Sequence, residues 1–416
     1  LVSLTGPAAA ATGYSVWLAY ILAVIVGFLS MLPLVSITSV MNFNGGAYTV
    51  ATTFLGQRFG GAFALLQVLN ALILSILGTA FGGYVHSVFP SVSARICGIV
   101  IIVLFWAIHC LGINLMTGVQ KYVTYVLLLA LAAFSVVSFS HFNTSALAFS
   151  GPEFFTNGAG GVFAAMAMLV FSCQSYDNNV LAFGRYTKEP RKNIPWGILA
   201  TFVSLILIYG ICTLAQVGAV DLAALSGKPL TDVSRAILPT WAFVLFIVLG
   251  PIMCLVSTVN GALASFTIGL SKSSEDGWLP KSLSVKSSRG TCTRILTLLC
   301  GICVIPIILN VNIGVLSSIT TLLTCVLQLP LLISFWRLPE MFPEQFKEST
   351  LHVSKGFYHG SIVVALAARL LLTYCCFRSL TAKVAIGAVI AAVCCFLFSY
   401  LRYKHVKPEE AGYFFD

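Results

Sequence analysis

One long apolar segment, residues 158–184, is interrupted by small and polar groups that could bind a ligand. The interrupting run is Phe171, Ser172, Cys173, Gln174, Ser175, Tyr176 and Asp177. Asp177 is the one acidic residue that falls inside any segment predicted here to cross a membrane. In lipid, each polar or charged group without a partner costs several kcal/mol, so the run must face protein, water or a ligand.

A second interruption opens the chain. It consists of Ser3, Leu4, Thr5, Gly6 and Pro7, and its Gly-Pro pair disfavours a continuous helix. Unwound backbone at membrane depth exposes N–H and C=O groups that can bind a carboxylate or an ammonium group, and half-helix N-termini favour the anion. Plainer interpretations stay open: residues 6–7 would only start or kink a helix, and residues 172–175 would only form hydrogen bonds between helices.

Long apolar helices must position these two runs. The sequence is 58% hydrophobic and only 9% charged, and apolar runs of about 18 to 30 residues recur along it, each long enough to span a bilayer. We therefore predict an all-α polytopic membrane protein with about twelve transmembrane helices, the first of them incomplete. The predicted spans are residues 1–11, 14–41, 60–88, 93–113, 118–139, 158–184, 196–217, 240–270, 294–310, 313–336, 357–377 and 382–401.

The basic residues collect in alternate loops, which predicts that both termini are cytoplasmic. This orientation explains the net charge of +10, and no basic cluster interleaved with aromatic residues indicates nucleic-acid binding. The paired cysteines are adjacent rather than in CxxC spacing, so they predict no metal site. The sequence has no P-loop, HExxH or nucleophile-elbow motif, and we expect neither an enzyme nor an ATP-driven pump, and no cofactor.

Three motifs, in order along the chain, resemble those of the amino acid–polyamine–organocation (APC) transporters. Residues 44–48 read NGGAY, residues 188–195 read KEPRKNIP, and residues 257–260 and 275–280 read STVN and EDGWLP. They resemble the family's PGGxY turn, its KNPxRNIP loop after span six, and its ST-x-N and RDGxLP elements at span eight. The resemblance covers about residues 1–280 and points to the amino acid permease branch.

This resemblance implies a five-plus-five inverted-repeat, LeuT-like fold in which helices 1 and 6 are broken. The first repeat would cover residues 1–139 and the second residues 158–336, followed by two further spans in residues 357–401. It also implies a secondary transporter of the plasma membrane that works by alternating access, with the substrate held between the two breaks.

The same resemblance implies roles for the residues of both runs. The substrate's α-carboxylate would meet backbone at residues 3–6, and its α-amino group would meet carbonyls at residues 171–175. Phe171 falls where related antiporters carry an aromatic gate, and Asp177 where they carry an acidic residue. Asp177 would carry a coupling proton or would cap the second half of its helix, and both interpretations stay open.

The coupling ion is open between H⁺ and Na⁺. Ser257 and Thr258 would ligate sodium together with carbonyls of the first span, or would only form a polar packing pair. The basic residue that many family members carry in span five aligns with Leu127, so that fixed charge is missing. We expect His109 to be a packing residue whose hydrogen bonding is satisfied, and Arg369 to snorkel or pair with carbonyls, both outside the site.

The predicted core is uncharged apart from Asp177, which favours a neutral amino acid of small or medium size as the substrate. Three alternatives stay open. The chain would carry a polyamine or other organic cation, or inorganic ions as in the cation–chloride branch, or it would be a non-transporting amino acid sensor. In each case the chain is embedded in the lipid bilayer, binds a small molecule and has no nucleic-acid partner.

Overall fold

The fold is taken from a computed structural model, which describes residues 4–170, 180–227, 230–311, 313–379, 382–406 and 412–415. The part that ends at Val170 is almost wholly helical. Its helices are α1 (Thr5–Thr12), α2 (Val16–Leu29), α3 (Leu32–Val40), α4 (Gly46–Leu55), α5 (Gln57–Asn70), α6 (Ile73–Val88), α7 (Ala94–Leu111), α8 (Ile113–Ser140) and α9 (Gly158–Val170). A 3₁₀ turn at Gly13–Ser15 joins α1 to α2.

The rest of the chain continues as helices. They are α11 (Pro190–Ala219), α12 (Leu222–Leu225), α13 (Leu230–Ile237), α14 (Thr240–Ile247), α15 (Met253–Glu275), α16 (Thr293–Ile308), α17 (Ile313–Ser334), α18 (Leu338–Met341), α19 (Pro343–Lys347), α20 (Lys355–Ser379) and α21 (Ala382–Arg402). A π-helical segment, Val248–Ile252, joins α14 to α15. It contains Pro251, whose missing N–H interrupts the regular hydrogen-bond ladder of the helix.

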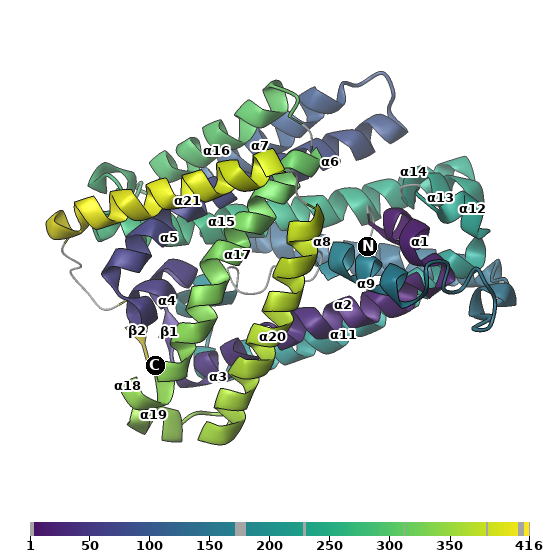
Figure 1. Cartoon of the computed structure of the whole chain (residues 1–416). Coiled ribbons are helices and arrows are strands. Elements are labelled where there is room, and N and C mark those ends of the chain that lie inside the picture. Colours follow the sequence, from purple (N-terminus) through teal and green to yellow (C-terminus); the bar gives the residue numbers. More distant parts are fainter. Residues whose placement is uncertain are drawn as a thin grey trace.

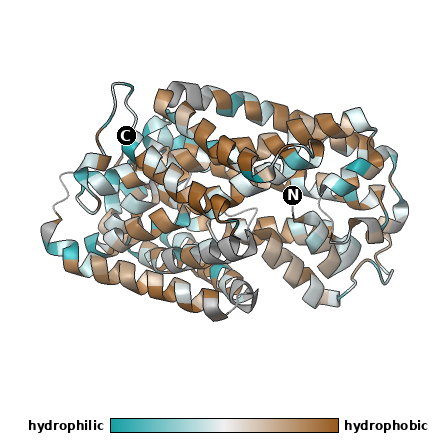
Figure 2. Cartoon of the chain, turned by 90° about the horizontal axis from the view of Figure 1, so that it is seen from above, coloured by the Kyte–Doolittle hydropathy of each residue, from teal (hydrophilic) through white to brown (hydrophobic). Residues whose placement is uncertain are grey.

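Nine helical segments of the described chain are long and apolar enough to cross a membrane. They are Thr5–Val40, Gln57–Val88, Ala94–Leu111, Gly118–Ser140, Pro190–Ala219, Thr240–Glu275, Leu322–Met341, Lys355–Tyr374 and Val384–Arg402. The apolar helices α9 and α16 are shorter. Figure 2 shows apolar residues along the long helices and hydrophilic residues toward the ends, most clearly around the C-terminus. Exposed apolar side chains such as Leu129, Val203 and Val393 suit contact with lipid.

The segments between the long helices gather at two ends of the molecule. One end, which we call the strand end, holds α4, α18, α19 and two short strands, β1 (Asn42–Phe43) and β2 (Tyr413–Phe414), which pair antiparallel (Figure 1). The other end holds α12 and α13, and we call it the cap end. The elements named at the strand end thus come from three segments that were predicted to lie on one side of the membrane. Which end faces the cytoplasm stays a prediction.

Arg191, at the start of α11, ties several segments of the strand end together. Its guanidinium group donates from Nε to the carbonyl of Ser39 at 3.2 Å, from Nη1 to that of Phe415 at 3.2 Å, and from Nη2 to that of Glu348 at 3.0 Å. Thr350 donates its hydroxyl to the carbonyl of Arg191 at 2.6 Å. The start of α11, the end of α3, the segment after α19 and the C-terminal strand thus share one set of hydrogen bonds.

Three boundaries differ from the sequence prediction. The break predicted at residues 3–7 is wrong for residues 5–7, because Thr5–Thr12 is helical. Pro7 lies in the first turn of that helix, where its missing N–H would have no partner within the helix. The predicted span 14–41 is interrupted between α2 and α3, and the span predicted to start at residue 196 already begins at Pro190, a favourable first helical position for proline.

Candidate functional site

Helices α1 and α9 lie side by side (Figure 1). Helix α1 contains residues 5–7 of the run at residues 3–7, and α9 ends directly before the run at residues 171–177. Asn157 donates from Nδ2 to the carbonyl of Ala11 at 2.9 Å, and the amide of Thr156 donates to the carbonyl of Thr12 at 3.3 Å. A side chain at Gly161 would collide with the carbonyl oxygen of Ala11, so glycine is what permits this close approach. The end of α1 therefore lies beside the start of α9, and the two helices run antiparallel.

This arrangement brings the start of α1 to the level where the described part of α9 stops. Leu4 is partly buried and packs against the buried apolar cluster that contains Leu169 and Val170. The first turn of a helix directs backbone N–H groups and a partial positive charge outward from its N-terminus. A ligand at this level would meet the positive end of α1, and residue 171 follows directly on Val170.

The cap end covers α1. The carbonyl of Gly6 accepts a hydrogen bond from the amide of Gly227 at 2.9 Å, and the hydroxyl of Tyr14 accepts one from the amide of Leu222 at 3.0 Å. Thr5 is 1% exposed, and its Oγ1 lies 3.4 Å from the hydroxyl of Tyr20. The segment around α12 thus closes over the first turn of α1.

The structure describes part of the predicted substrate site. Leu4, Thr5 and Gly6 form the start of α1. Ser3 and the run Phe171, Ser172, Cys173, Gln174, Ser175 and Asp177 lie outside the described residues. The predictions for that run are therefore untested.

The predicted ion ligands Ser257 and Thr258 lie in α15. Thr258 donates its hydroxyl to the carbonyl of Cys254 in the preceding turn at 2.8 Å. Ser257 Oγ accepts a hydrogen bond from Gln120 Nε2 of α8 at 2.6 Å. The two hydroxyl groups thus have different partners, and Ser257 is the one that faces a neighbouring helix.

Ser257 ends a chain of polar side chains that joins α7, α8 and α15. Gln120 Oε1 accepts from Asn260 Nδ2 at 3.0 Å, and Asn260 Oδ1 lies 2.9 Å from His109 Nε2. His109 and Asn260 are buried. The hydrogen bond of His109 Nε2 fits the prediction of a satisfied packing residue, but the network to which His109 belongs was not predicted. Gln120 and Asn260, two amides within apolar spans, were the signal in the sequence.

Two of the sequence motifs meet where α4 faces the end of α15. The hydroxyl of Tyr48, from the NGGAY motif, donates to Asp276 Oδ2 of the EDGWLP motif at 2.8 Å. Lys272 Nζ lies 3.0 Å from Asp276 Oδ1. Burial, and secondly the negative charge of Asp276, raise the pKa of Tyr48 well above its usual value. The motifs thus fix α4 against α15.

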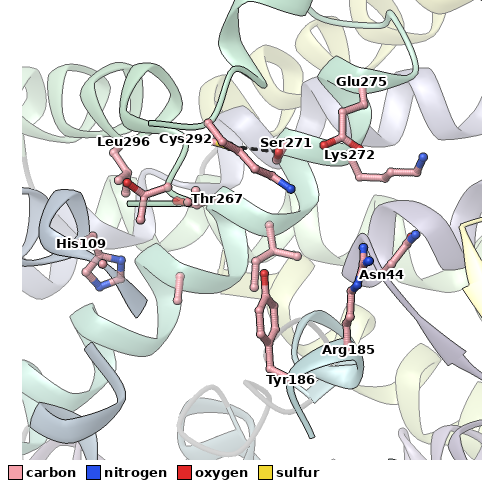
Figure 3. Close-up of a pocket in the computed structure, with 16 residues that line it drawn as sticks. Asn44, His109, Arg185, Tyr186, Thr267, Ser271, Lys272, Glu275, Cys292 and Leu296 are labelled. Atoms are coloured by element: carbon pink, nitrogen blue, oxygen red, sulfur yellow. Dashed lines mark hydrogen bonds between the residues drawn. The ribbon is translucent and has the colours of Figure 1, made fainter. Parts of the chain in front are cut away.

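A cavity of about 130 Å³ lies beside this contact. It is lined by Asn44, His109, Gly112, Arg185, Tyr186, Ala264, Thr267, Ile268, Ser271, Lys272, Glu275, Lys286, Gly290, Thr291, Cys292 and Leu296. In Figure 3, His109 lies at one side, Arg185 and Asn44 lie at the other, and the ring of Tyr186 points between them. Cys292 Sγ lies 3.2 Å from Ser271 Oγ. Within the described residues, no three His, Cys, Asp or Glu side chains cluster as metal ligands would.

Comparison with known proteins decides the family. Residues 1–401 match the sequence profile of the amino acid permease family. The chain belongs to this family. The APC resemblance and the prediction of an integral membrane protein are thereby confirmed. The expectation that the chain is not an enzyme is also confirmed, because the family consists of transporters.

One curated relative of the permease is a plant protein. The two sequences are 26% identical over 238 residues, and the relative is cationic amino acid transporter 3, mitochondrial, of Arabidopsis thaliana. The alignment covers 55% of this chain and 38% of the relative. The match therefore spans well under half the length of that protein. The substrate class in its name describes that protein alone.

Proposed function

We propose that the chain is a secondary active transporter that moves a neutral amino acid across the plasma membrane by alternating access. The observation that carries the proposal is the antiparallel pairing of α1 and α9. It supports a site in which the start of α1 binds the substrate's carboxylate and backbone at residues 171–175 binds its amino group. The inverted repeats at residues 1–139 and 158–336, the total of about twelve spans and the cytoplasmic termini are parts of the same proposal.

The distribution of acidic residues favours a neutral substrate. Asp177 is the only acidic residue within a predicted span. Glu275 and Asp276 lie where α15 ends, and Asp276 is already paired with Lys272. A zwitterion needs no further fixed charge, because helix termini and backbone carbonyls complement its two ends.

A cationic amino acid is the second candidate. The name of the Arabidopsis relative favours it, and Asp177 would then be the carboxylate that balances the charged side chain. The two candidates differ in what Asp177→Asn does: it would abolish transport of lysine and arginine in the cationic case, whereas a neutral substrate would still be carried.

The test is uptake by the purified full chain in proteoliposomes, with empty liposomes as the control. Radiolabelled neutral, basic and acidic amino acids and one polyamine are each offered with a sodium gradient, a proton gradient or neither. Saturable uptake of neutral amino acids supports the proposal, and the effective gradient identifies the coupling ion. Uptake confined to lysine, arginine or the polyamine would overturn the neutral substrate. Binding of an amino acid without uptake would indicate a sensor.

A further inference from the structure

The cavity beside α15 is rich in positive charge and in hydrogen-bond donors. Its volume of about 130 Å³ gives room for several water molecules or one small organic ion. Three basic side chains line it: Arg185, Lys272 and Lys286. Among the described lining residues, Glu275 is the one that carries a carboxylate. Hydroxyl groups of Tyr186, Ser271 and Thr291 add further donors.

Two of the three positive charges have no partner within the described chain. Lys272 forms its ion pair with Asp276 at 3.0 Å, and the second oxygen of Asp276 accepts from Tyr48. Arg185 and Lys286, in contrast, make no ion pair or hydrogen bond with any described residue. Against the single charge of Glu275, the cavity therefore carries an excess of positive charge, which attracts an anion.

His109 adds a titratable group to the wall of the cavity. Asn260 uses Nδ2 to donate to Gln120, so its Oδ1 acts as the acceptor toward His109 Nε2. The hydrogen of the neutral ring then lies on Nε2, which leaves Nδ1 as the atom that can gain a proton. Nδ1 has no hydrogen-bond partner in the described part of the structure.

We propose that this cavity binds a small carboxylate anion and that His109 takes up a proton as the anion binds. A neutral Nδ1 offers only a lone pair to a carboxylate, whereas a protonated Nδ1 donates a hydrogen bond. The groups that face His109 across the cavity are Arg185 and Tyr186 before α11, Lys272 and Glu275 of α15, and Lys286 and Cys292 between α15 and α16.

The charge of the anion links the two events. A bound carboxylate places its negative charge beside His109, which favours a proton on the ring. Anion binding and proton uptake therefore favour each other by the same factor. Affinity for the anion rises as the pH falls through the range in which His109 titrates. The site does not depend on the identity of the transported substrate.

The test is binding of acetate to the purified full chain in detergent at low ionic strength. Isothermal titration is carried out at about pH 6 and about pH 8, on either side of the usual histidine range. We expect acetate to bind about fivefold or more tightly at the lower pH, and acetamide, its uncharged analogue, not to bind. The carboxylate site would be overturned if acetamide bound as tightly as acetate. It would also be overturned if chloride displaced bound acetate with an affinity equal to that of acetate.

Variants separate the role of the His109 proton from that of the fixed positive charges. His109→Gln retains an N–H donor for Asn260 but cannot titrate, so acetate affinity should become the same at both pH values. Arg185 and Lys286 are exposed, so replacing them leaves the core intact. Arg185→Gln and Lys286→Gln should each weaken acetate binding at both pH values. Arg289→Gln, a change in the same loop outside the cavity lining, is the matched control and should bind as the unaltered chain does. An unchanged pH dependence in His109→Gln would refute the role of the proton.

A competition arm identifies the source of the carboxylate. Glycine carries the same group on an amino acid. If glycine displaces acetate, the site takes the carboxylate of an amino acid; if it does not, the site takes free carboxylates. Both arms measure binding in detergent and do not require transport. A failure of this site would therefore be distinct from a failure of transport in liposomes.

Discussion

Tyr48 donates its hydroxyl hydrogen to Asp276 Oδ2 over 2.8 Å, and this bond joins α4 to the end of α15. Both residues are buried. Asp276 Oδ1 makes no hydrogen bond in the described part of the structure but lies 3.0 Å from Lys272 Nζ as an ion pair. A buried carboxylate with one hydrogen bond and one ion pair is stable only while both partners remain. The contact is therefore sensitive to single substitutions on either helix.

Removing the Tyr48 hydroxyl should destabilise the fold. Tyr48→Phe leaves Asp276 Oδ2 buried without its donor, which costs about 1–3 kcal/mol. The loss appears as a lower midpoint of thermal unfolding in detergent. Tyr186→Phe, which removes a hydroxyl from an exposed ring, is the control. Equal midpoints for the two variants would contradict the importance of this bond.

The Tyr48 hydroxyl should also make the stability of the fold depend on pH under alkaline conditions. Burial and the nearby carboxylate raise the pKa of Tyr48 in the folded state, while the unfolded chain titrates near the usual value of about 10. Above about pH 10 the unfolded state loses the proton and the folded state keeps it, so the contribution to stability is complete below about pH 10 and declines above it. Unfolding midpoints of the unaltered chain should therefore fall more steeply between about pH 9 and pH 11 than those of Tyr48→Phe.

The Lys272–Asp276 pair should show strong coupling between its two members. The side chains are 9% and 5% exposed, and removing one partner of a buried pair costs about 3–5 kcal/mol. Lys272→Met alone should be more damaging than Lys272→Met combined with Asp276→Leu, because the double change leaves no buried charge. Denaturant unfolding of the four forms gives the coupling energy.

An exposed pair on the same molecule provides the comparison. Lys192 and Glu189 lie 3.9 Å apart with side chains 65% and 73% exposed. Glu189→Gln should change the free energy of unfolding by less than about 1 kcal/mol. Similar losses in the exposed and the buried pair would mean that burial is not what makes Asp276 sensitive.

Arg191 should hold the C-terminal strand in place. Arg191→Ala removes hydrogen bonds to three carbonyl groups, each worth about 0.5–1.5 kcal/mol. We expect faster proteolysis near Tyr413 in that variant. Arg191→Lys should restore little, because an ammonium group lacks the planar fork of donors. Lys192→Ala, at the next position, is the control and should be cleaved at the original rate.

Asp177→Asn tests the two interpretations of that residue. If Asp177 carries the coupling proton, the substitution removes the pH dependence of uptake into proteoliposomes. If it caps a helix, the pH profile keeps its shape and only stability falls, by about 1 kcal/mol. Uptake that is unchanged at every pH would end the proton interpretation.

The sequence was sufficient for the long apolar helices, since the length of a span is set directly by the thickness of the bilayer. The described helices α1 and α9 lie against each other, but residues 5–7 are helical rather than broken, and residues 171–177 lie outside the described part of the chain. The NGGAY and EDGWLP motifs were recognised, but their contact through Tyr48 and Asp276 was not. That contact depends on how α4 and α15 pack, and no local pattern records it.

Other features were harder to predict, for physical reasons. A single histidine within an apolar span looks the same whether it packs or joins a polar network, and only the positions of Asn260 and Gln120 on other helices separate the two cases for His109. Gly6 and Pro7 fit a break and a first helical turn equally well. Strands of two residues carry no alternating pattern at all, so β1 and β2 left no signal.

The pairing of β1 with β2 allows detachment of the C-terminal strand to be measured without a label. Two residues on each side are too few to stay paired without support from neighbouring contacts. The amide of Asn44, which donates to the carbonyl of Gly412 at 3.0 Å, is shielded from water only while the tail is in place. The rate at which that one amide exchanges its hydrogen for deuterium therefore measures how often the tail detaches, and it can be followed through a transport cycle without any added label.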